Sequence, residues 1–192
     1  MRFTGMIVHG TYGSPFAHWL PSLSHWARDA GGALYVPHLP SPAGQDFDTW
    51  ATIVDSYRAA GLLGDAPAMI GASSGAAFLT RYILSRGLTG ALLVTVSGFN
   101  NHRSGHQESD AANSTFSVDE AALGEVATRF TRRVAFYATD DPYLPTAVLA
   151  RFATAITAEH RVIAGAGHFN TQSGYDTFPD LEHLLAELWP AR

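Results

Sequence analysis

The clearest indication of the fold in this chain is the segment Gly71-Ala72-Ser73-Ser74-Gly75. It separates a short apolar run, Ala68–Ile70, from a segment in which apolar residues recur with helical spacing. The pattern G-x-S-x-G between a strand and a helix is typical of a tight turn that lifts a serine hydroxyl above a sheet on strained backbone. The flanking glycines avoid clashes that a Cβ would cause. We predict Ser73 as a nucleophile; a turn of small residues that only packs the helix on the sheet is the alternative.

Five more apolar runs with the length of strands alternate with helical segments along the chain. They are Met6–Val8, Ala33–Val36, Ala91–Val96, Val134–Tyr137 and Arg161–Ile163. Strict alternation of strands and helices predicts right-handed crossovers and a parallel sheet covered by helices on both faces. We therefore expect an α/β fold, a three-layer sandwich with about six parallel strands. The length of 192 residues favours a single domain over residues 1–192.

One of the predicted helices has a specific start signal. Ser117-x-x-Glu120 matches a capping box, in which a serine hydroxyl and a glutamate side chain satisfy the first backbone N–H groups of a helix. We therefore predict a helix capped at Ser117, with an apolar stripe at Leu123, Val126, Ala127 and Phe130.

Composition excludes several classes of function. The formal net charge is -5 and no basic run occurs, which disfavours nucleic acid and anionic membranes as partners. The chain has no cysteine, and its 12 basic residues are all arginine, which excludes thiolate, iron–sulfur, Schiff-base and Walker-lysine chemistry. We expect no cofactor. His102 and His106 have a spacing that can bind a metal on a helix, but Ser104-Gly105 between them disfavours a helix, so we expect no metal.

The start of the chain and its apolar runs bear on location. Residues 1–5 lead into a short apolar stretch without a basic leader or a small-residue cleavage site. The longest apolar runs, such as Ala91–Val96, are far shorter than the roughly 20 residues that span a bilayer. We therefore expect a cytoplasmic protein without a membrane partner. The sequence leaves the oligomeric state open.

A serine nucleophile at neutral pH needs a histidine base, and the histidine needs a carboxylate to orient it. The fifth predicted strand ends in Thr139-Asp140-Asp141-Pro142, and the sixth leads to Gly165-Ala166-Gly167-His168. The order serine, acid, histidine is that of α/β-hydrolases. Asp141 precedes a proline, which favours extended backbone and can orient the side chain, so we prefer it to Asp140. The predicted triad is Ser73, Asp141 and His168; an ordinary turn and a surface histidine are the alternatives.

Acyl transfer also needs N–H donors for the oxyanion of the tetrahedral intermediate. One should be the backbone N–H of Ser74, directly after the nucleophile. The other should come from the loop after the first strand, His9-Gly10-Thr11-Tyr12, in which Thr11 or Tyr12 would supply it. A glycine-rich phosphate cradle is the alternative for this loop, but no G-x-G-x-x-G pattern occurs. The candidate residues of the substrate pocket are His9, Phe99 and Phe169.

Together these motifs resemble the small serine hydrolases that include retinoblastoma-binding protein nine and its bacterial relatives. The resemblance spans nearly the whole chain and implies a minimal α/β-hydrolase sheet without the two leading strands, with the triad at Ser73, Asp141 and His168. It implies no known substrate. The family commonly has histidine before the nucleophile, whereas this chain has Ala72. The motifs that carry the resemblance are Val8-His9-Gly10, His18-Trp19-Leu20-Pro21, Gly71-Ala72-Ser73-Ser74-Gly75-Ala76, Thr139-Asp140-Asp141-Pro142-Tyr143-Leu144-Pro145 and Gly167-His168-Phe169.

These observations favour a cofactor-independent serine hydrolase that cleaves small acyl esters or amides through an acyl-enzyme. The alternative is a catalytically silent binding or scaffold protein on the same fold, because a fold alone does not prove activity. The sequence does not separate a hydrolase from a lyase or perhydrolase with the same triad.

Residues 100–117, after the fourth predicted strand, contain no Leu, Ile or Val and are rich in Asn, Ser and His. We expect no core element from such a composition. Loops of this length in compact domains are usually functional or disordered, so we predict a mobile lid that limits the acyl pocket. A solvated connection without a role is the alternative. Phe99 and Phe116 would be its apolar anchors, one at the pocket and the other on the helix that follows.

Overall fold

A six-stranded sheet forms the centre of the computed structural model, which describes residues 3–103, 105 and 107–189. Its strands lie in the order β2-β1-β3-β4-β5-β6, and every neighbouring pair is parallel. All six predicted strands are confirmed, although some of their ends differ from the prediction. The strands are β1 (Thr4–Val8), β2 (Ala33–Tyr35), β3 (Ala68–Ala72), β4 (Gly90–Val96), β5 (Phe130–Ala138) and β6 (Glu159–Ile163).

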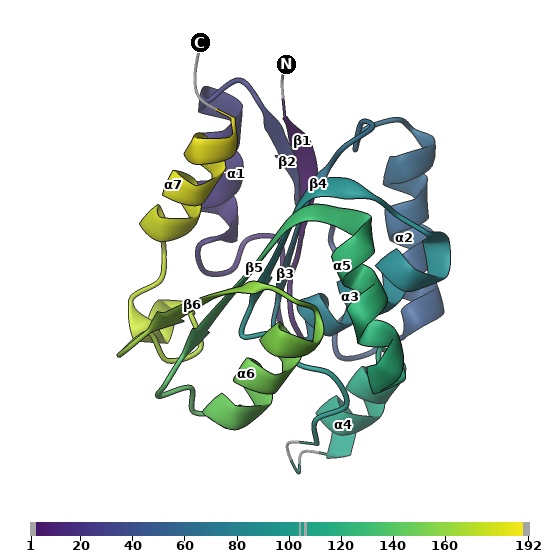
Figure 1. Cartoon of the computed structure of the whole chain (residues 1–192), viewed down its shortest axis with the longest axis vertical. Helices are drawn as coiled ribbons and strands as arrows, with labels where there is room; N and C mark the ends of the chain where they lie inside the picture. The colour runs from purple at the N-terminus through teal and green to yellow at the C-terminus, as the bar shows by residue number, and fades with distance from the viewer. Residues whose placement is uncertain (1–2, 104, 106, 190–192) are drawn as a thin grey trace.

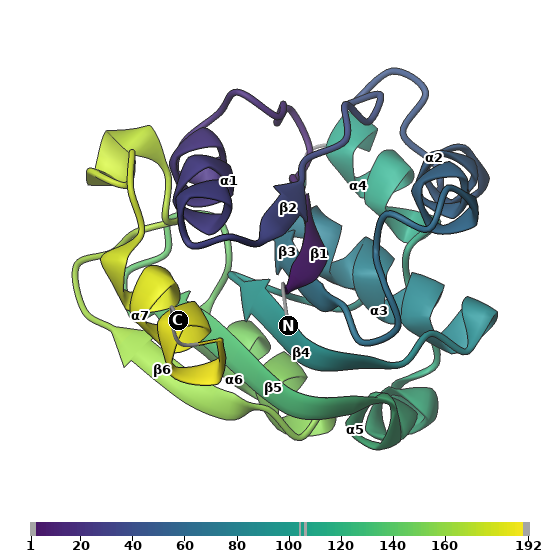
Figure 2. The ribbon, with the colours of Figure 1, turned by 90° about the horizontal axis from the view of Figure 1, so that it is seen from above.

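Helices cover both faces of this sheet, which confirms the predicted three-layer α/β sandwich. The α-helices of the described residues are α1 (Leu20–Asp29), α2 (Phe47–Ala59), α3 (Ser74–Arg86), α4 (Gln107–Ser114), α5 (Val126–Arg129), α6 (Thr146–Ala155) and α7 (Pro179–Leu188). In Figure 1, α1 and α7 lie on one side of the sheet, and α2, α3 and α5 lie on the other. Figure 2 shows the twisted sheet between the same two groups from above.

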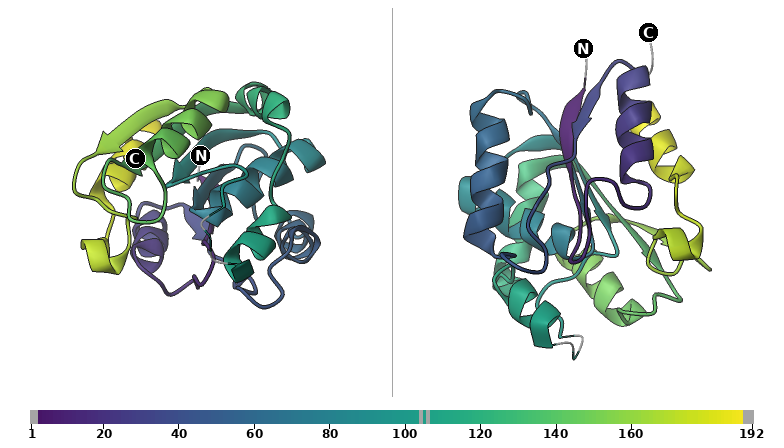
Figure 3. Two further views of the ribbon diagram at one scale, coloured as in Figure 1. Left: turned by 90° about the horizontal axis from the view of Figure 1, so that it is seen from below. Right: turned by 180° about the vertical axis from the view of Figure 1, so that it is seen from behind.

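The alternation of side chains along the strands divides the core into two main parts. Met6 and Val8 of β1 belong to the cluster built with α2 and α3, whereas Ile7 between them belongs to the cluster built with α1 and α7. Successive side chains of a strand point to opposite faces, so one strand supplies both clusters. Helices cover both faces of the sheet, so the loops at the carboxyl ends of the strands are the expected place for a functional site. Figure 3 shows the molecule from below and from behind.

The prediction of a helix capped at Ser117 is wrong. The Asp119 side chain instead accepts a hydrogen bond from the Ala121 N–H and caps a 3-10 segment, Glu120–Glu125, which α5 follows. The Asn100 side chain hydrogen-bonds both the N–H and the carbonyl oxygen of Val118 and so ties the residue after Ser117 to the end of β4. The 3-10 segment begins two residues later, at Glu120. The predicted stripe also ends early, since Phe130 begins β5.

The segment 100–117 contains a short helix, α4, none of whose residues is buried. Phe116, however, is fully buried, with its ring 4.8 Å from that of Trp50 in α2 and 5.5 Å from that of Phe78 in α3. The prediction that this segment forms no core element fits α4. Phe116, predicted as an apolar anchor on the helix that follows, packs its ring on α2 and α3. The lid itself stays a prediction.

Candidate active site

Ser73 occupies the sharp turn between β3 and α3. Its backbone has φ 53° and ψ -123°, a strained combination for a residue with a Cβ, and α3 begins at the next residue. Sterics explain the flanking glycines. A Cβ on Gly75 would lie 2.3 Å from the carbonyl oxygen of Val8, and one on Gly71 would lie 2.6 Å from the Cα of Ala76. Glycine at both positions therefore lets α3 approach the sheet closely, with Ser73 at its edge.

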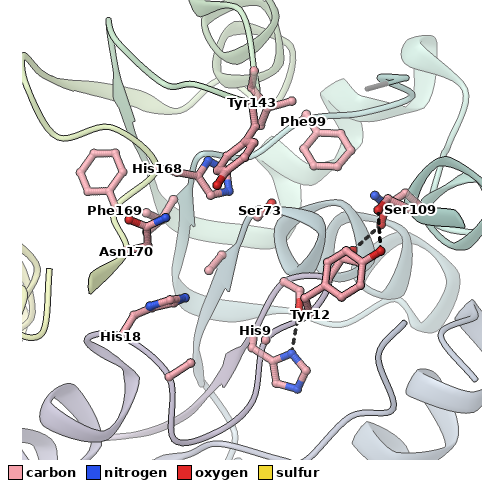
Figure 4. Close-up of a pocket in the computed structure, with 18 of the residues that line it drawn as sticks. His9, Tyr12, His18, Ser73, Phe99, Ser109, Tyr143, His168, Phe169 and Asn170 are labelled. Carbon is pink, nitrogen blue, oxygen red and sulfur yellow. Dashed lines mark hydrogen bonds between the residues drawn. The ribbon is translucent and has the colours of Figure 1, made fainter. Parts of the chain in front are cut away.

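His168 lies near Ser73 (Figure 4) and is held by Asp141. The distance between His168 Nδ1 and Asp141 Oδ2 is 2.7 Å. His168 belongs to the loop after β6, in which Gly165 and Gly167 have φ angles of 77° and 52° that favour glycine. The loops after β3, β5 and β6 thus bring the predicted nucleophile, acid and base to one edge of the sheet.

The carboxylate of Asp141 is buried and has four hydrogen-bond donors. Oδ1 accepts from the backbone N–H groups of Tyr143 and Leu144, at 2.9 and 3.1 Å, and Oδ2 accepts from the Ser97 hydroxyl at 2.8 Å and from His168. Burial alone would raise the pKa of Asp141. The hydrogen bond and the charge of His168, with the Tyr143 and Ser97 donors, hold that pKa below its ordinary value. Asp141 is therefore ionised, so Nδ1 of His168 carries a proton and Nε2 can accept one.

The adjacent carboxylate, Asp140, makes different contacts. Its Oδ1 accepts hydrogen bonds from the backbone N–H groups of Gly165 at 3.0 Å and Gly167 at 3.4 Å. These bonds tie the loop that carries His168 to the end of β5. In the structure Asp141 contacts the histidine itself, and Asp140 holds the histidine's loop.

The side chain of Ser74, the residue directly after Ser73, is buried and hydrogen-bonded to Thr11. Its Oγ accepts a hydrogen bond from the Thr11 N–H at 2.7 Å and lies 2.8 Å from Thr11 Oγ1. The Ser74 N–H is the first amide of α3, so it has no acceptor within the helix. The side chain of Ser74 is thus tied into the protein, while its backbone amide lies at a helix N-terminus, which favours anions.

The two amides predicted as alternative second oxyanion donors both have partners. The Thr11 N–H donates to Ser74 Oγ, and the Tyr12 N–H donates to Ser41 Oγ at 2.7 Å. Ser74 belongs to the nucleophile turn, whereas Ser41 lies between β2 and α2. The Thr11 amide is therefore the one that points toward the turn. The identity of the second donor stays a prediction.

A cavity of about 480 Å³ opens at the edge of the sheet where Ser73 and His168 meet. Its wall is mostly apolar, with a few amide, hydroxyl and imidazole groups and the carboxylate of Asp110, and no arginine is among the described residues that line it. The apolar lining includes Trp19, Leu20, Val96, Phe99 and Leu144, and the polar lining includes His18, Asn113, Asn170 and Gln172.

The predicted pocket residues Phe99 and Phe169 both border this cavity, but differently. Phe99 faces the cavity near Ser73 (Figure 4). Phe169 turns its ring away and packs it against Tyr175 and Phe178, with ring centroids 4.9 and 5.3 Å apart. Phe169 therefore shapes the cavity through its backbone, while its ring belongs to the core.

The third predicted pocket residue, His9, uses both ring nitrogens inside the protein. Nδ1 donates to the carbonyl oxygen of Gly10 at 2.9 Å, and Nε2 accepts from the Leu39 N–H at 3.2 Å. Burial lowers the pKa of His9, against the effect of the Gly10 hydrogen bond. His9 is therefore a neutral residue that holds two loops together, although it borders the cavity.

Three side chains at the site were missed in the sequence. Ser97, which donates to Asp141, directly follows β4, so the rule that the ends of parallel strands share an edge could have identified it. The Tyr143 ring lies 4.9 Å from that of His168. His18 points into the cavity (Figure 4), and its Nδ1 accepts from the Thr171 N–H at 3.2 Å. Tyr143 and His18 lie within the motifs of the resemblance, but no local pattern indicated that their side chains border the cavity.

Within residues 3–103, 105 and 107–189, no three histidine or carboxylate side chains are grouped so that they could hold a metal ion. No helix in that part of the chain has the length and apolar character needed to cross a bilayer. His106, considered above with His102, lies outside the described residues.

Comparisons with known proteins point to one class. A family model described as serine hydrolase matches residues 5–187. The fold is similar to the ydeN gene product from B. subtilis, with a TM-score of 0.85, 20% identity and coverage of 96% of this chain and 97% of that chain. It is also similar to a putative YdeN-like hydrolase from Pectobacterium atrosepticum, with a TM-score of 0.69, 22% identity and coverage of 97% and 90%.

A meta-cleavage product hydrolase from Pseudomonas fluorescens has a TM-score of 0.70 at 12% identity, with coverage of 97% of this chain and 91% of that chain. No curated protein sequence matches the chain. At these identities the solved structures show a shared fold, the α/β-hydrolase fold, and carry no information about the substrate.

Proposed function

The chain belongs to the serine hydrolase family, and from that premise we propose that it cleaves small acyl esters or amides without a cofactor, through an acyl-enzyme on Ser73. In this proposal His168 is the base, Asp141 orients it, and the Ser74 N–H is one oxyanion donor. The Thr11 N–H is the other, because it points toward the nucleophile turn whereas the Tyr12 N–H points to Ser41. A substrate oxyanion would either share the Thr11 N–H with Ser74 Oγ or take the place of Ser74 Oγ as its acceptor.

One observation carries the proposal: the 2.7 Å hydrogen bond between His168 Nδ1 and a fully buried Asp141 carboxylate, beside a serine on strained backbone. A buried carboxylate is costly unless it is well hydrogen-bonded, and Asp141 has four donors. Arrangements of this kind cluster at functional sites. The placement of Ser73, His168 and Asp141 at one edge of the sheet supports an active enzyme over a catalytically silent scaffold.

The chemistry follows from these contacts. Ser73 Oγ attacks the substrate carbonyl while His168 Nε2 takes the serine proton, and the Asp141 carboxylate stabilises the imidazolium that forms. The oxyanion of the tetrahedral intermediate accepts hydrogen bonds from the two backbone N–H groups. Collapse breaks the bond to the leaving group, which receives the proton from Nε2. Water then attacks the acyl-enzyme with the same assistance, releasing the acid and restoring the serine.

The cavity supports a small and uncharged acyl group. Its volume of about 480 Å³ suits a small molecule, and its wall is mostly apolar with few polar groups. Without an arginine in the described lining, no fixed cation is at hand to pair with a substrate carboxylate. Neutral esters and amides are therefore better candidates than dicarboxylates.

Fluorophosphonate labelling tests the proposal directly. We expect the wild-type protein to be modified at Ser73, as found by mass spectrometry of the labelled peptide, and to hydrolyse a short nitrophenyl ester. Ser73→Ala should abolish both, because its hydroxyl is the nucleophile. The control is Ser74→Ala, which removes the neighbouring hydroxyl and should still be labelled at Ser73. Circular dichroism should show that both variants fold.

Three results would contradict the proposal. Labelling of Ser74, or labelling that survives Ser73→Ala, would remove Ser73 as the nucleophile. A folded wild-type protein that is neither labelled nor active on short esters would instead support the silent binding or scaffold protein.

A further inference from the structure

A partly buried polar network beside the proposed triad joins four separate segments of the chain, with Gln45 and Ser74 as its buried members. Gln45, from the loop before α2, donates through Nε2 to Thr11 Oγ1 at 2.9 Å and to Asn113 Oδ1 at 2.8 Å. Thr11 Oγ1 donates to Asn113 Oδ1 at 3.0 Å and lies 2.8 Å from Ser74 Oγ. The network thus connects the loop after β1, the start of α3 and the helix α4. The reaction steps described above use neither Gln45 nor Asn113.

The direction of each hydrogen bond in this network is determined. The single Thr11 hydroxyl proton goes to Asn113, so Thr11 Oγ1 accepts from the Ser74 hydroxyl. Ser74 Oγ in turn accepts from the Thr11 N–H. At the other end, Gln45 Oε1 accepts from the Ser41 hydroxyl, whose oxygen accepts from the Tyr12 N–H. Both loop amides considered as oxyanion donors are therefore connected to the same network.

A network of this kind needs an explanation beyond packing. Gln45 is only 5% exposed, and an apolar side chain would fill its place without the cost of burying an amide. Thr11 and Asn113 both line the catalytic cavity. Fully satisfied buried networks hold their members in one arrangement. The arrangement held here is that of the loop after β1 against the nucleophile turn.

We propose that Gln45 and Asn113 are positioning residues of the hydrolysis, which hold Thr11 against the nucleophile turn and make the oxyanion side of the site depend on α4. This inference rests on the proposed function. Asn113 contributes an acceptor from α4 at a point where Gln45 and Thr11 both donate. With α4 packed as in the structure, Asn113 holds the loop that carries Thr11 against the start of α3. Without Asn113, the Thr11 hydroxyl and the Gln45 amide lose their shared acceptor.

The test compares Asn113→Ala with Ser114→Ala. Ser114 is the next residue on α4; it is exposed, and its hydroxyl bonds to the carbonyl oxygen of Ala111 within the helix. We expect Asn113→Ala to lower kcat between about 10- and 100-fold while KM stays within about twofold, because a misplaced donor weakens the transition state and not substrate binding. Fluorophosphonate labelling of Ser73 should slow by a similar factor. Ser114→Ala should leave these values unchanged.

Thr11 offers a second test that does not depend on the folding of the Asn113 variant. Thr11→Val keeps the shape but removes the hydroxyl, and it should reproduce the loss of kcat. Thr11→Ser keeps the hydroxyl and should restore kcat to near the wild-type value. The double variant Thr11→Val with Asn113→Ala should be no slower than either single variant, because residues of one network are not additive.

The outcomes separate the two proposals. If the wild-type protein is labelled at Ser73 and Asn113→Ala and Thr11→Val lower only the melting temperature, the network is merely structural and the positioning role is wrong. A change in KM alone would equally overturn it, since α4 would then act only as a wall of the cavity. If the wild-type protein is not labelled at all, it is the proposed function that fails.

Discussion

At the residue scale, Asp140 and Asp141 show how two adjacent identical side chains acquire different roles. In the sequence, the proline after Asp141 and the family resemblance favoured Asp141 over Asp140. The structure separates them by their donors, since Asp141 receives the imidazole and a hydroxyl, whereas Asp140 receives two backbone amides. At Asp141 the negative charge itself stabilises the imidazole of His168 when it is protonated. At Asp140 a neutral amide oxygen could still accept the hydrogen bonds from the two glycine N–H groups.

We predict that Asp141→Asn lowers kcat by about 10⁴-fold, the loss known for the same exchange in a well-studied triad. The asparagine can present an N–H to Nδ1 and so favour the wrong tautomer of His168. Asp140→Asn keeps a carbonyl oxygen for the Gly165 and Gly167 amides, and its kcat should fall less than about tenfold. Steady-state ester hydrolysis checks both; a larger loss for Asp140→Asn would transfer the triad role to Asp140.

His9 leads to a prediction about pH and stability. Burial lowers its pKa below the ordinary value of 6.5. As the pH falls below that value, the unfolded chain binds a proton at His9 more readily than the folded protein, so acid destabilises the fold. The melting temperature of the wild-type protein should therefore fall between about pH 7 and 5.

The variant that tests this is His9→Gln, which retains an acceptor for the Leu39 N–H but does not titrate. It should be less stable at pH 7, because the contact between the imidazole and Trp50 is lost, but its melting temperature should depend less on pH. Equal slopes for the two proteins in thermal unfolding scans from pH 5 to 8 would show that His9 is not the titrating group.

At the scale of elements, the site depends on how closely α3 approaches β1. The first turn of α3 lies against the last residues of β1, and a Cβ on Gly75 would meet the carbonyl oxygens of both Val8 and His9, at 2.3 and 2.6 Å. These are backbone atoms, which cannot rotate away as a side chain does. Glycine at position 75, two residues after Ser73, is thus required by the packing of α3 on β1 as well as by the turn.

We expect Gly75→Ala to destabilise the protein by about 3 kcal/mol or more, because α3 must move away from β1. Gly124→Ala is the matched control, since a Cβ there meets no atom within 4 Å and its φ is not positive. Denaturant unfolding measures both variants. If Gly75→Ala were as stable as Gly124→Ala, the close approach of α3 would not limit the choice of residue.

At the scale of the whole molecule, segments distant in sequence surround one cavity. The loop after β1, the nucleophile turn, α4 and the loops after β5 and β6 all contribute to its lining. Helix α4 does so through Ser109, Asp110 and Asn113, while Phe116 anchors the segment in the core. A polar segment that is fixed by one ring and borders the cavity is suited to limit the size of the acyl group.

We predict that replacing residues 107–114 by a Gly-Ser linker raises the ratio of kcat/KM for hexanoyl over acetyl esters by at least about tenfold, since each buried methylene is worth about 1 kcal/mol or more. The ratio is informative because loss of Asn113 should lower both rates alike. Ser114→Ala should leave the ratio unchanged. An unaltered ratio in a folded replacement variant would mean that α4 does not limit the size of the acyl group.

The sequence alone was enough to predict the six strands, the turn at Ser73 and the helices between the strands, except for α4 and the segment after Phe116. Strand and helix periods are written in consecutive residues, and the glycines beside Ser73 are required by sterics over a few bonds. The start of the helical segment after Phe116 was predicted wrongly. The side chain of Asn100, 18 residues before Val118, hydrogen-bonds the backbone of Val118, and the helical segment begins only at Glu120. Local patterns do not record such a contact.

Only the tertiary structure decided which groups meet at the edge of the sheet. Ser97 and Asp141 are 44 residues apart, and Thr11 and Asn113 are 102 apart. Their hydrogen bonds exist because parallel strands end at a common edge and because Phe116 holds α4 near the loop after β1. Serine, glutamine and asparagine occur on most protein surfaces, so their types give no signal of such a partner. Distances between segments, set by the packing of helices on the sheet, decide which of them become part of the site.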